Sequence, residues 1–182
     1  TAVRESGTVF DWKTADALRR SMDLARQAVT EVRTLSHMLY PRLLEEAGLV
    51  EALRYFQGGF QERTGIKVYL DLPGKFRRLP PEAERTLFRV VQECLGNVQR
   101  HSHATQSWVS LRREPSQVVL EVRDNGQGMP PSAGTQSPGD SPRQGFGLRT
   151  LTERMKQLDG RLELESGPEG TRITATLPMP SQ

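Results

Sequence analysis

An acidic residue followed closely by two glycines stands in the middle of the chain. Residues 124–128 read Asp-Asn-Gly-Gln-Gly and come directly after the alternating stretch 118–122. A strand there would fix the Asp124 carboxylate as a hydrogen-bond acceptor, and the glycines would let a flat ligand approach the main chain. Asp-Asn-Gly by itself is more often a tight turn. A binding site at Asp124 is therefore predicted only in combination with other segments.

A second group of polar side chains lies on a segment that precedes this strand. Glu93, Asn97 and His101 are spaced four residues apart, so on a helix they would share one stripe, with Arg100 beside them. A carboxylate and a carboxamide one turn apart can hold a hydrated magnesium ion. Arg100 and His101 could then meet phosphate oxygens. An ordinary solvated helix face explains this stripe equally well when it is considered alone.

The third segment is Gly145-Phe146-Gly147-Leu148, which follows a stretch rich in Pro, Gly and Ser. It is expected to open a helix, where main-chain N–H groups without helical partners form an anion site. The segment lacks the Lys-Ser/Thr ending of a P-loop and the third glycine of a dinucleotide fingerprint, so a nucleotide would be bound in another way. A hinge or tight turn is the commoner explanation of a lone Gly-x-Gly.

Periodicity and turn residues predict the elements that would position these groups. Helices are predicted at about 49–63, from Pro80-Pro81-Glu82 onward, and at about 147–158. The apolar face of the long helix is formed by Leu87, Val90, Val91, Cys94, Leu95 and Val98. Strands are predicted at 66–72, 107–112, 117–123, 161–165 and 171–177.

Two further segments have no part in this core. Residues 129–144 offer almost nothing to bury and are expected to form a mobile loop, either a plain linker or a lid. A heptad seam runs from Leu18 to Leu39 and ends at Pro41. The seam favours a helix that dimerises, and a helix packed on its own domain is the alternative.

Composition excludes several classes of function. Lysine plus arginine exceeds aspartate plus glutamate by only 25 to 22, and the arginines are scattered, so a nucleic-acid partner is not expected. The single cysteine, Cys94, excludes an internal disulfide and a zinc site built on cysteine pairs, and it fits a reducing compartment. No apolar run approaches the ~20 residues that a membrane-spanning helix requires.

The order of these segments resembles the ATP-binding domain of the GHKL superfamily, which is shared by DNA gyrase B subunits, heat-shock chaperones, MutL proteins and sensor histidine kinases. The resemblance spans about residues 45–179. Residues 93–101 are similar to the N box of that superfamily, 124–128 to its first glycine box and 145–148 to its second. The resemblance implies a two-layer α/β sandwich with a mixed, mostly antiparallel sheet, helices on one face and an additional N-terminal helix.

Within the superfamily, the chain is most similar to histidine kinases of the nitrate-sensor and desaturase-thermosensor type. Residues 31–41 resemble the end of the second helix of a dimerisation hairpin, and 43–49 resemble the junction that follows it. This implies a partial hairpin at 1–42 and an ATP-binding catalytic domain at 43–182, with a lid at about 129–144.

The resemblance also implies a role for each matching residue. Asp124 would accept a hydrogen bond from the adenine amino group, Thr171 would help through its hydroxyl and water, and Gly126 and Gly128 would give the base room. Asn97 would ligate magnesium, and Glu93 would orient the attacking group or act as general base. The residues expected at the phosphates are Arg100, His101, Arg143, Gly145, Phe146, Gly147 and Leu148.

The implied activity is transfer of the γ-phosphate of ATP to a histidine on a dimerisation helix. None of the three histidines, His37, His101 and His103, lies in a sequence like the acceptor run of that family. The acceptor is therefore expected upstream of Thr1, and this chain is not expected to phosphorylate itself. The implied partners are a second subunit in the full-length protein and a response regulator receiver domain. The implied location is the cytoplasm, with membrane contact only through upstream regions.

Two other functions remain as alternatives. A nucleotide-binding regulatory module or serine kinase of the anti-sigma-factor type would share the same boxes, although the heptad seam from Leu18 to Leu39 is not typical of it. A protein-interaction domain that binds no nucleotide would not require the three boxes in this order.

Overall fold

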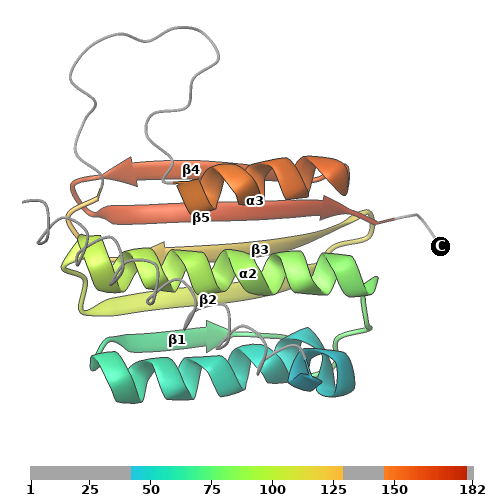
Figure 1. Ribbon diagram of the computed structural model, residues 1–182, viewed down its shortest axis with the longest axis horizontal. Coiled ribbons are helices and arrows are strands. Elements are labelled where there is room, and N and C mark those ends of the chain that lie inside the picture. The colour runs from blue at the N-terminus through green and yellow to red at the C-terminus, as the bar shows by residue number, and fades with distance from the viewer. Residues whose placement is uncertain (1–41, 129–145, 180–182) are drawn as a thin grey trace, which may run out of the picture. The chain divides into compact units, whose positions relative to one another are not determined.

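The computed structural model describes residues 42–128 and 146–179 (Figure 1). Apart from Arg42, these residues belong to one unit, Leu43–Gln182. The predicted heptad helix, its end at Pro41 and the predicted loop at 129–144 lie outside the described residues and stay predictions. No helix in the described part of the chain is long and apolar enough to cross a membrane.

Five strands form one mixed sheet in the order β1-β2-β3-β5-β4. The strands are β1 (Lys67–Asp71), β2 (Gln106–Arg113), β3 (Gln117–Asp124), β4 (Arg161–Gly167) and β5 (Gly170–Pro178). Only the β1–β2 pair is parallel, and the other three pairs are antiparallel. The predicted mixed, mostly antiparallel sheet is confirmed, and each predicted strand matches an observed one within two residues at either end.

The helices pack on one face of this sheet, as predicted (Figure 1). They are a helix at 42–64, α2 (Pro81–Asn97), a π-helical turn η1 (Val98–Ser102) and α3 (Phe146–Gln157). Buried residues alternate with less buried ones along β2 and β3, so each strand presents one side to the helices. All six residues predicted for the apolar face of the long helix are buried.

The opposite face of the sheet carries an aromatic and cationic stack. Tyr69 stacks on Trp108 with ring centroids 5.8 Å apart, and the Arg123 guanidinium lies 4.4 Å from the Trp108 ring centre. Tyr69 alternates with the buried Val68 along β1 and remains 46% exposed. The sheet therefore has one helix-covered face and one polar face.

The helix at 42–64 begins earlier than the sequence predicted. Leu44 and Leu49 are both buried, so packing against the domain extends the helical segment toward its N-terminus. Gly48 has φ +86°, a left-handed conformation that interrupts the regular helix between Leu44 and Leu49. The predicted start at about Leu49 therefore coincides with the segment that follows this break, and the turn before it is added by packing.

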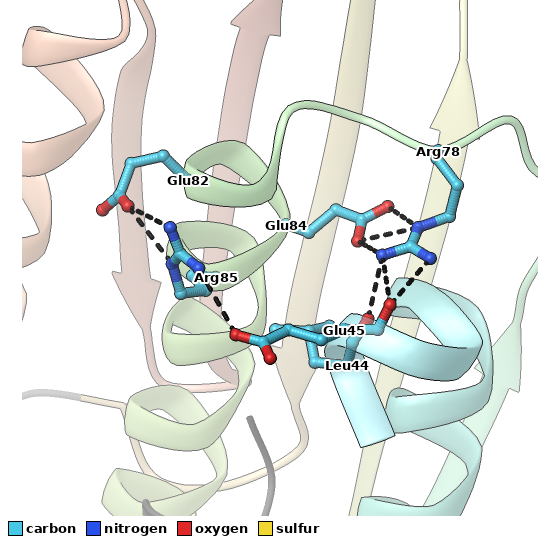
Figure 2. A network of polar contacts seen from close by, with 6 residues as sticks. All are labelled: Leu44, Glu45, Arg78, Glu82, Glu84 and Arg85. Atoms are coloured by element: carbon cyan, nitrogen blue, oxygen red, sulfur yellow. Dashed lines mark hydrogen bonds and ion pairs between the residues drawn. The ribbon is translucent and has the colours of Figure 1, made fainter. Parts of the chain in front are cut away.

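A network of polar contacts ties this helix to the start of α2 (Figure 2). The carboxylate of Glu84 is 1% exposed and accepts hydrogen bonds from Arg78 Nε at 2.9 Å and from the Leu79 N–H at 3.0 Å. Arg78 also donates to the main-chain carbonyls of Leu44 and Glu45, each at 3.1 Å. The hydrogen bond to Glu84 raises the pKa of Arg78. One guanidinium therefore satisfies a buried carboxylate and two helix carbonyls together.

Two glutamine side chains cover the outer edge of β1. Gln61 Oε1 accepts a 2.6 Å hydrogen bond from the Val68 N–H, and Gln57 Nε2 donates a 2.9 Å hydrogen bond to the Val68 carbonyl. An uncovered edge strand is a template for pairing with another chain. Two side chains of the helix at 42–64 thus satisfy the main-chain N–H and carbonyl of one residue of this edge strand, Val68.

Candidate functional site

Asp124 ends β3 on the helix-covered side of the sheet and is 7% exposed. Its Oδ1 accepts a 2.8 Å hydrogen bond from the Gly126 N–H, and the Thr171 N–H also hydrogen-bonds to the carboxylate. Burial raises the pKa of Asp124, and the two N–H donors oppose that rise. The main-chain N–H groups therefore fix the position of the carboxylate, although its removal from water costs free energy.

Asn125 fixes the loop that follows Asp124. Its Oδ1 accepts hydrogen bonds from the Thr105 and Gln106 N–H groups, each at 3.0 Å, and its Nδ2 donates to Thr105 Oγ1 at 3.2 Å. The next residues bind the end of the helix, because the Gln127 N–H donates to the Ser102 carbonyl at 2.9 Å. The loop of the first glycine box is thus attached to the segment that leads from η1 into β2.

Glycines line the approach to the Asp124 carboxylate closely. A Cβ at Gly126 would overlap the Ser102 carbonyl oxygen, and one at Gly128 would overlap the Gly167 carbonyl oxygen. A Cβ at Gly170 would overlap the Asp124 carbonyl oxygen, and both Gly128 and Gly170 have positive φ angles, +69° and +123°. No other residue type fits these three positions without a backbone shift. The loop, the β4–β5 turn and Asp124 form one cradle.

Thr171 enters this cradle from β5. Its register partner in β4 is Ser166, and the two hydroxyl oxygens lie 3.1 Å apart, within hydrogen-bond distance. The residues predicted to bind adenine, Asp124, Gly126, Gly128 and Thr171, therefore lie close together, and their predicted role stays a prediction.

The N-box residues form a second cluster, with Glu93 and Asn97 on the last turn of α2 and Arg100 in η1. Arg100 Nη2 donates a 2.8 Å hydrogen bond to Asn97 Oδ1 and lies 3.6 Å from Glu93 Oε1. The Glu93 and Arg100 side chains are 29% and 33% exposed, so the pair is neither buried nor fully solvated. The predicted neighbourhood of Glu93, Asn97 and Arg100 is present.

The first turn of α3 lies against this cluster. A Cβ at Gly147 would overlap the Glu93 carboxylate, so the second glycine box and the N box meet at these two residues. Leu148 is 1% exposed, so its side chain belongs to the core and only its main chain could face a ligand. The helix begins at Phe146, where the first N–H groups have no partner within the helix.

The predicted stripe runs from α2 into the following turn. Regular α-helix ends at Asn97, and His101 lies in the π-helical turn η1 that continues it. His101 is exposed, and its carbonyl accepts a hydrogen bond from Gln127 Nε2 at 3.1 Å. His103 follows η1 at φ +54°.

Arg143 and Gly145 lie outside the described residues, and so does the side chain of Phe146. Their predicted roles at the phosphates stay predictions.

The chemistry of the two clusters fits a metal–nucleotide complex. Glu93 and Asn97 present a carboxylate and a carboxamide oxygen that hold a side-chain cation, Arg100, and such oxygens suit Mg²⁺. Asp124 presents a buried acceptor among glycines that pack closely against neighbouring main chain. Among the described residues, no three His, Cys, Asp or Glu side chains cluster as a metal site.

Cys94 lies between these clusters but is not suited to chemistry. Burial, followed by the charges of Glu93 and Asp124, raises the pKa of its thiol, so the reactive thiolate is disfavoured.

Some residues of the site were missed from the sequence. Ser102 serves as acceptor for the glycine-box loop, and its Oγ donates to the Val98 carbonyl at 2.8 Å inside η1. Ser166 and Gly170 line the cradle through the β4–β5 turn. The glycine preceding Thr171 was a usable signal, because a glycine at a strand start often marks close backbone approach. The π-helical turn had no recognisable signal.

Comparison with known proteins agrees with this geometry. Residues 82–181, more than half of the chain, match the family described as "Histidine kinase-, DNA gyrase B-, and HSP90-like ATPase". The chain is 39% identical over 159 residues to the sensor histidine kinase MctS of Rhizobium johnstonii, covering 87% of this chain and 34% of that protein. It is 30% identical over 171 residues to the signal transduction histidine-protein kinase/phosphatase DegS of Brevibacillus brevis, covering 92% of this chain and 42% of that protein.

A solved structure supports the fold. The histidine kinase domain from the Erythrobacter litoralis EL346 blue-light activated histidine kinase superposes with a TM-score of 0.56 at 23% identity, covering 71% of this chain and 60% of that one. The chain spans less than half the length of the two curated relatives above. The predicted superfamily is confirmed: the chain belongs to the family of histidine kinase-, DNA gyrase B- and HSP90-like ATPases.

Proposed function

We propose that this chain is the ATP-binding catalytic part of a two-component sensor histidine kinase. The observation that carries the proposal is the buried Asp124 carboxylate among closely packed glycines, together with the N-box cluster of Glu93, Asn97 and Arg100. The names of the relatives favour a histidine kinase over an anti-sigma-factor type of module. The proposed division into a partial hairpin at 1–42 and a catalytic domain at 43–182 is supported by the unit that begins at Leu43.

Asp124 is proposed to select adenine. An ionised carboxylate only accepts hydrogen bonds, so it suits an exocyclic amino group and disfavours the keto group of guanine. Its hydrogen bonds to the Gly126 and Thr171 N–H groups fix the orientation of the carboxylate. The Thr171 hydroxyl, held near Ser166, adds a second polar group beside the base.

The N box and the start of α3 are proposed to hold the triphosphate and its metal. Asn97 would bind Mg²⁺, and Arg100 and His101 would meet phosphate oxygens. The α3 N-terminus would supply N–H donors from Gly147 and Leu148. Bound Mg²⁺ would neutralise charge that develops on the phosphate oxygens.

Glu93 is proposed to act on the incoming nucleophile. A histidine nitrogen attacks the γ-phosphorus, a nitrogen–phosphorus bond forms, and the bond from that phosphorus to the β,γ-bridging oxygen breaks to leave ADP. Glu93 accepts the proton that the imidazole loses, or orients the ring for attack. The acceptor histidine lies on a dimerisation helix of the proposed full-length dimer, and a response regulator receives the phosphate in the cytoplasm.

The test supplies the acceptor separately. The chain is incubated with labelled Mg-ATP and a dimerisation hairpin that contains an acceptor histidine, taken from a relative such as the R. johnstonii protein. We expect phosphate on the hairpin that is lost in acid and stable in base, and Glu93→Gln should reduce its formation by about 10²-fold or more. Acid-stable phosphate on serine would favour the anti-sigma-factor alternative, and no transfer with any hairpin would contradict kinase activity.

A further inference from the structure

Arg100 bridges the two side chains that the proposed function assigns to the metal and to the nucleophile. One of its nitrogens, Nη2, lies 2.8 Å from Asn97 Oδ1 and 3.6 Å from Glu93 Oε1. These oxygens are of the type that takes Mg²⁺ in proteins. The guanidinium is therefore held by oxygen atoms of the type that could bind a magnesium ion.

Gly96 provides the room for this arrangement. A Cβ at this position would come 3.0 Å from Arg100 Nη1 and 3.3 Å from Nη2, closer than an ordinary van der Waals contact. Glycine in a helix interior costs up to about 1 kcal/mol relative to alanine. The contact with Arg100 gives this otherwise unfavourable glycine a physical reason: it allows the guanidinium to lie along the helix, over Asn97 and Glu93.

The backbone at Arg100 is also unusual. The residue lies in the π-helical turn Val98–Ser102, which follows Asn97 directly. Such turns widen the helix and are common at functional sites. The turn is held at its far end by the hydrogen bond from Ser102 Oγ to the Val98 carbonyl at 2.8 Å. Arg100 is thus carried by a well-fixed turn while its side chain remains one-third exposed and able to move.

We propose that Arg100 is a replaceable counter-ion of the metal site and that Gly96 positions it. This inference rests on the proposed function, because it takes Asn97 as the residue at the metal and Glu93 as its neighbour at the nucleophile. In the nucleotide-free protein, Arg100 neutralises Glu93 and occupies Asn97 Oδ1. When nucleotide and metal bind, Asn97 Oδ1 exchanges the guanidinium for the hydrated ion, Glu93 becomes available to the nucleophile, and Arg100 turns to the phosphates.

The exchange makes metal and nucleotide bind cooperatively. A metal ion alone must displace Arg100 and leave the guanidinium without its two oxygen partners. With nucleotide present, Arg100 gains phosphate oxygens in compensation, so the displacement costs less free energy. By linkage, the metal must improve nucleotide affinity by the same factor.

The test measures Mn²⁺ binding to the nucleotide-free 182-residue protein by electron paramagnetic resonance, with Mn²⁺ in place of Mg²⁺. Arg100→Gln should bind Mn²⁺ about two- to fivefold more tightly than wild type, the range expected for a partly exposed ion pair. Asn97→Ala together with Arg100→Gln should lose this gain. The matched control is Arg89→Gln, which removes a positive charge one turn before Glu93 on α2 and should give a smaller gain.

Gly96→Ala tests the packing while keeping every charge. The added methyl group should displace the guanidinium and raise Mn²⁺ affinity in the same direction as Arg100→Gln, with no loss of thermal stability. No gain in Gly96→Ala would overturn the role of Gly96.

No gain in Arg100→Gln, or an equal gain in Arg89→Gln, would overturn the counter-ion role of Arg100. Failure of the proposed function is recognised separately, because it would appear as unchanged binding of an ATP analogue to Asp124→Asn.

Discussion

The Gly126 N–H donates a 2.8 Å hydrogen bond to Oδ1 of Asp124, so the glycine-box loop orients the carboxylate that precedes it by two residues. The Thr171 N–H approaches the same carboxylate from β5. Two segments that are distant in the sequence therefore fix one acceptor. The arrangement keeps a buried negative charge where a ligand can use it, although the charge itself weakens the fold.

This cost predicts a pH-dependent gain of stability in Asp124→Asn. Burial raises the pKa of Asp124 in the folded protein above its ordinary value of 3.8. At pH values between the pKa of the unfolded chain and the raised pKa of the folded protein, the folded protein binds more protons than the unfolded chain. The free energy of unfolding of the wild type therefore falls as pH rises through this range. The free energy of unfolding of Asp124→Asn minus that of wild type should therefore increase with pH through this window and then stay constant. Urea titrations across the acidic range measure the difference.

Asp124→Ala is the control for this prediction. It removes the buried charge but also leaves the Gly126 and Thr171 N–H groups without the carboxylate acceptor, so it should be less stable than Asp124→Asn at neutral pH. A difference between Asp124→Asn and wild type that does not change with pH would contradict the raised pKa.

Gly128→Ala should destabilise the protein strongly. The residue has φ +69°, and a Cβ would overlap the Gly167 carbonyl oxygen. Left-handed strain and overpacking together predict a loss of about 2–5 kcal/mol in the free energy of unfolding. The matched control is Gly74→Ala, where nothing lies within 4 Å of the added carbon, and its effect should be within about 1 kcal/mol. Equal effects in urea denaturation would show that the cradle tolerates a side chain.

Arg78→Met should lower the thermal unfolding midpoint more than Arg85→Met. Arg78 is hydrogen-bonded to the buried Glu84 carboxylate and to carbonyls of the helix at 42–64 (Figure 2). Its removal leaves the charge of Glu84 with the Leu79 N–H as its remaining donor among these contacts. Arg85 pairs with Glu82 and Glu45 at the surface, where such pairs contribute about 0.2–1 kcal/mol. Similar midpoints for the two variants would contradict the importance of the buried carboxylate.

Gln61→Ala should reduce the protection of the Val68 amide, at the outer edge of β1, against hydrogen exchange. The Val68 N–H loses its 2.6 Å hydrogen bond, and a net value of about 1 kcal/mol predicts roughly fivefold faster hydrogen exchange at that amide. Glu62→Ala, at the exposed neighbouring position, should leave the exchange rate unchanged. Unchanged protection in Gln61→Ala would show that the side chain does not cover the edge.

The sequence predicted most of the fold because its patterns and its packing agree. Alternation along β2 and β3, and the apolar spacing on α2, each correspond to a face that is buried. Two boundaries were not predictable. The helical segment 42–64 includes a turn before the break at Gly48, where Leu44 is buried, and α2 changes to a π-helical turn after Asn97. Both depend on contacts with residues far along the chain.

The sequence predicted which residues belong to the candidate site better than it predicted their contacts. Asp124, Glu93 and Asn97 were identified because few other side chains can serve as hydrogen-bond acceptor, base or magnesium ligand. The contact between Arg100 and Asn97, and the role of Gly96 in allowing it, could not be read from spacing, since both depend on the π-helical turn and on side-chain conformation. Leu148 was assigned to the phosphates as part of a motif, yet its side chain is in the core.

The central claim is that Asp124 holds the adenine of ATP, and its most direct test is calorimetric titration of a non-hydrolysable ATP analogue with Mg²⁺ into wild type and Asp124→Asn. Wild type should bind with micromolar to millimolar affinity, and the variant, although folded and at least as stable at neutral pH, should bind at least about tenfold more weakly, because a charged acceptor is lost. Equal affinity of the two proteins for the analogue would contradict the assignment of this pocket.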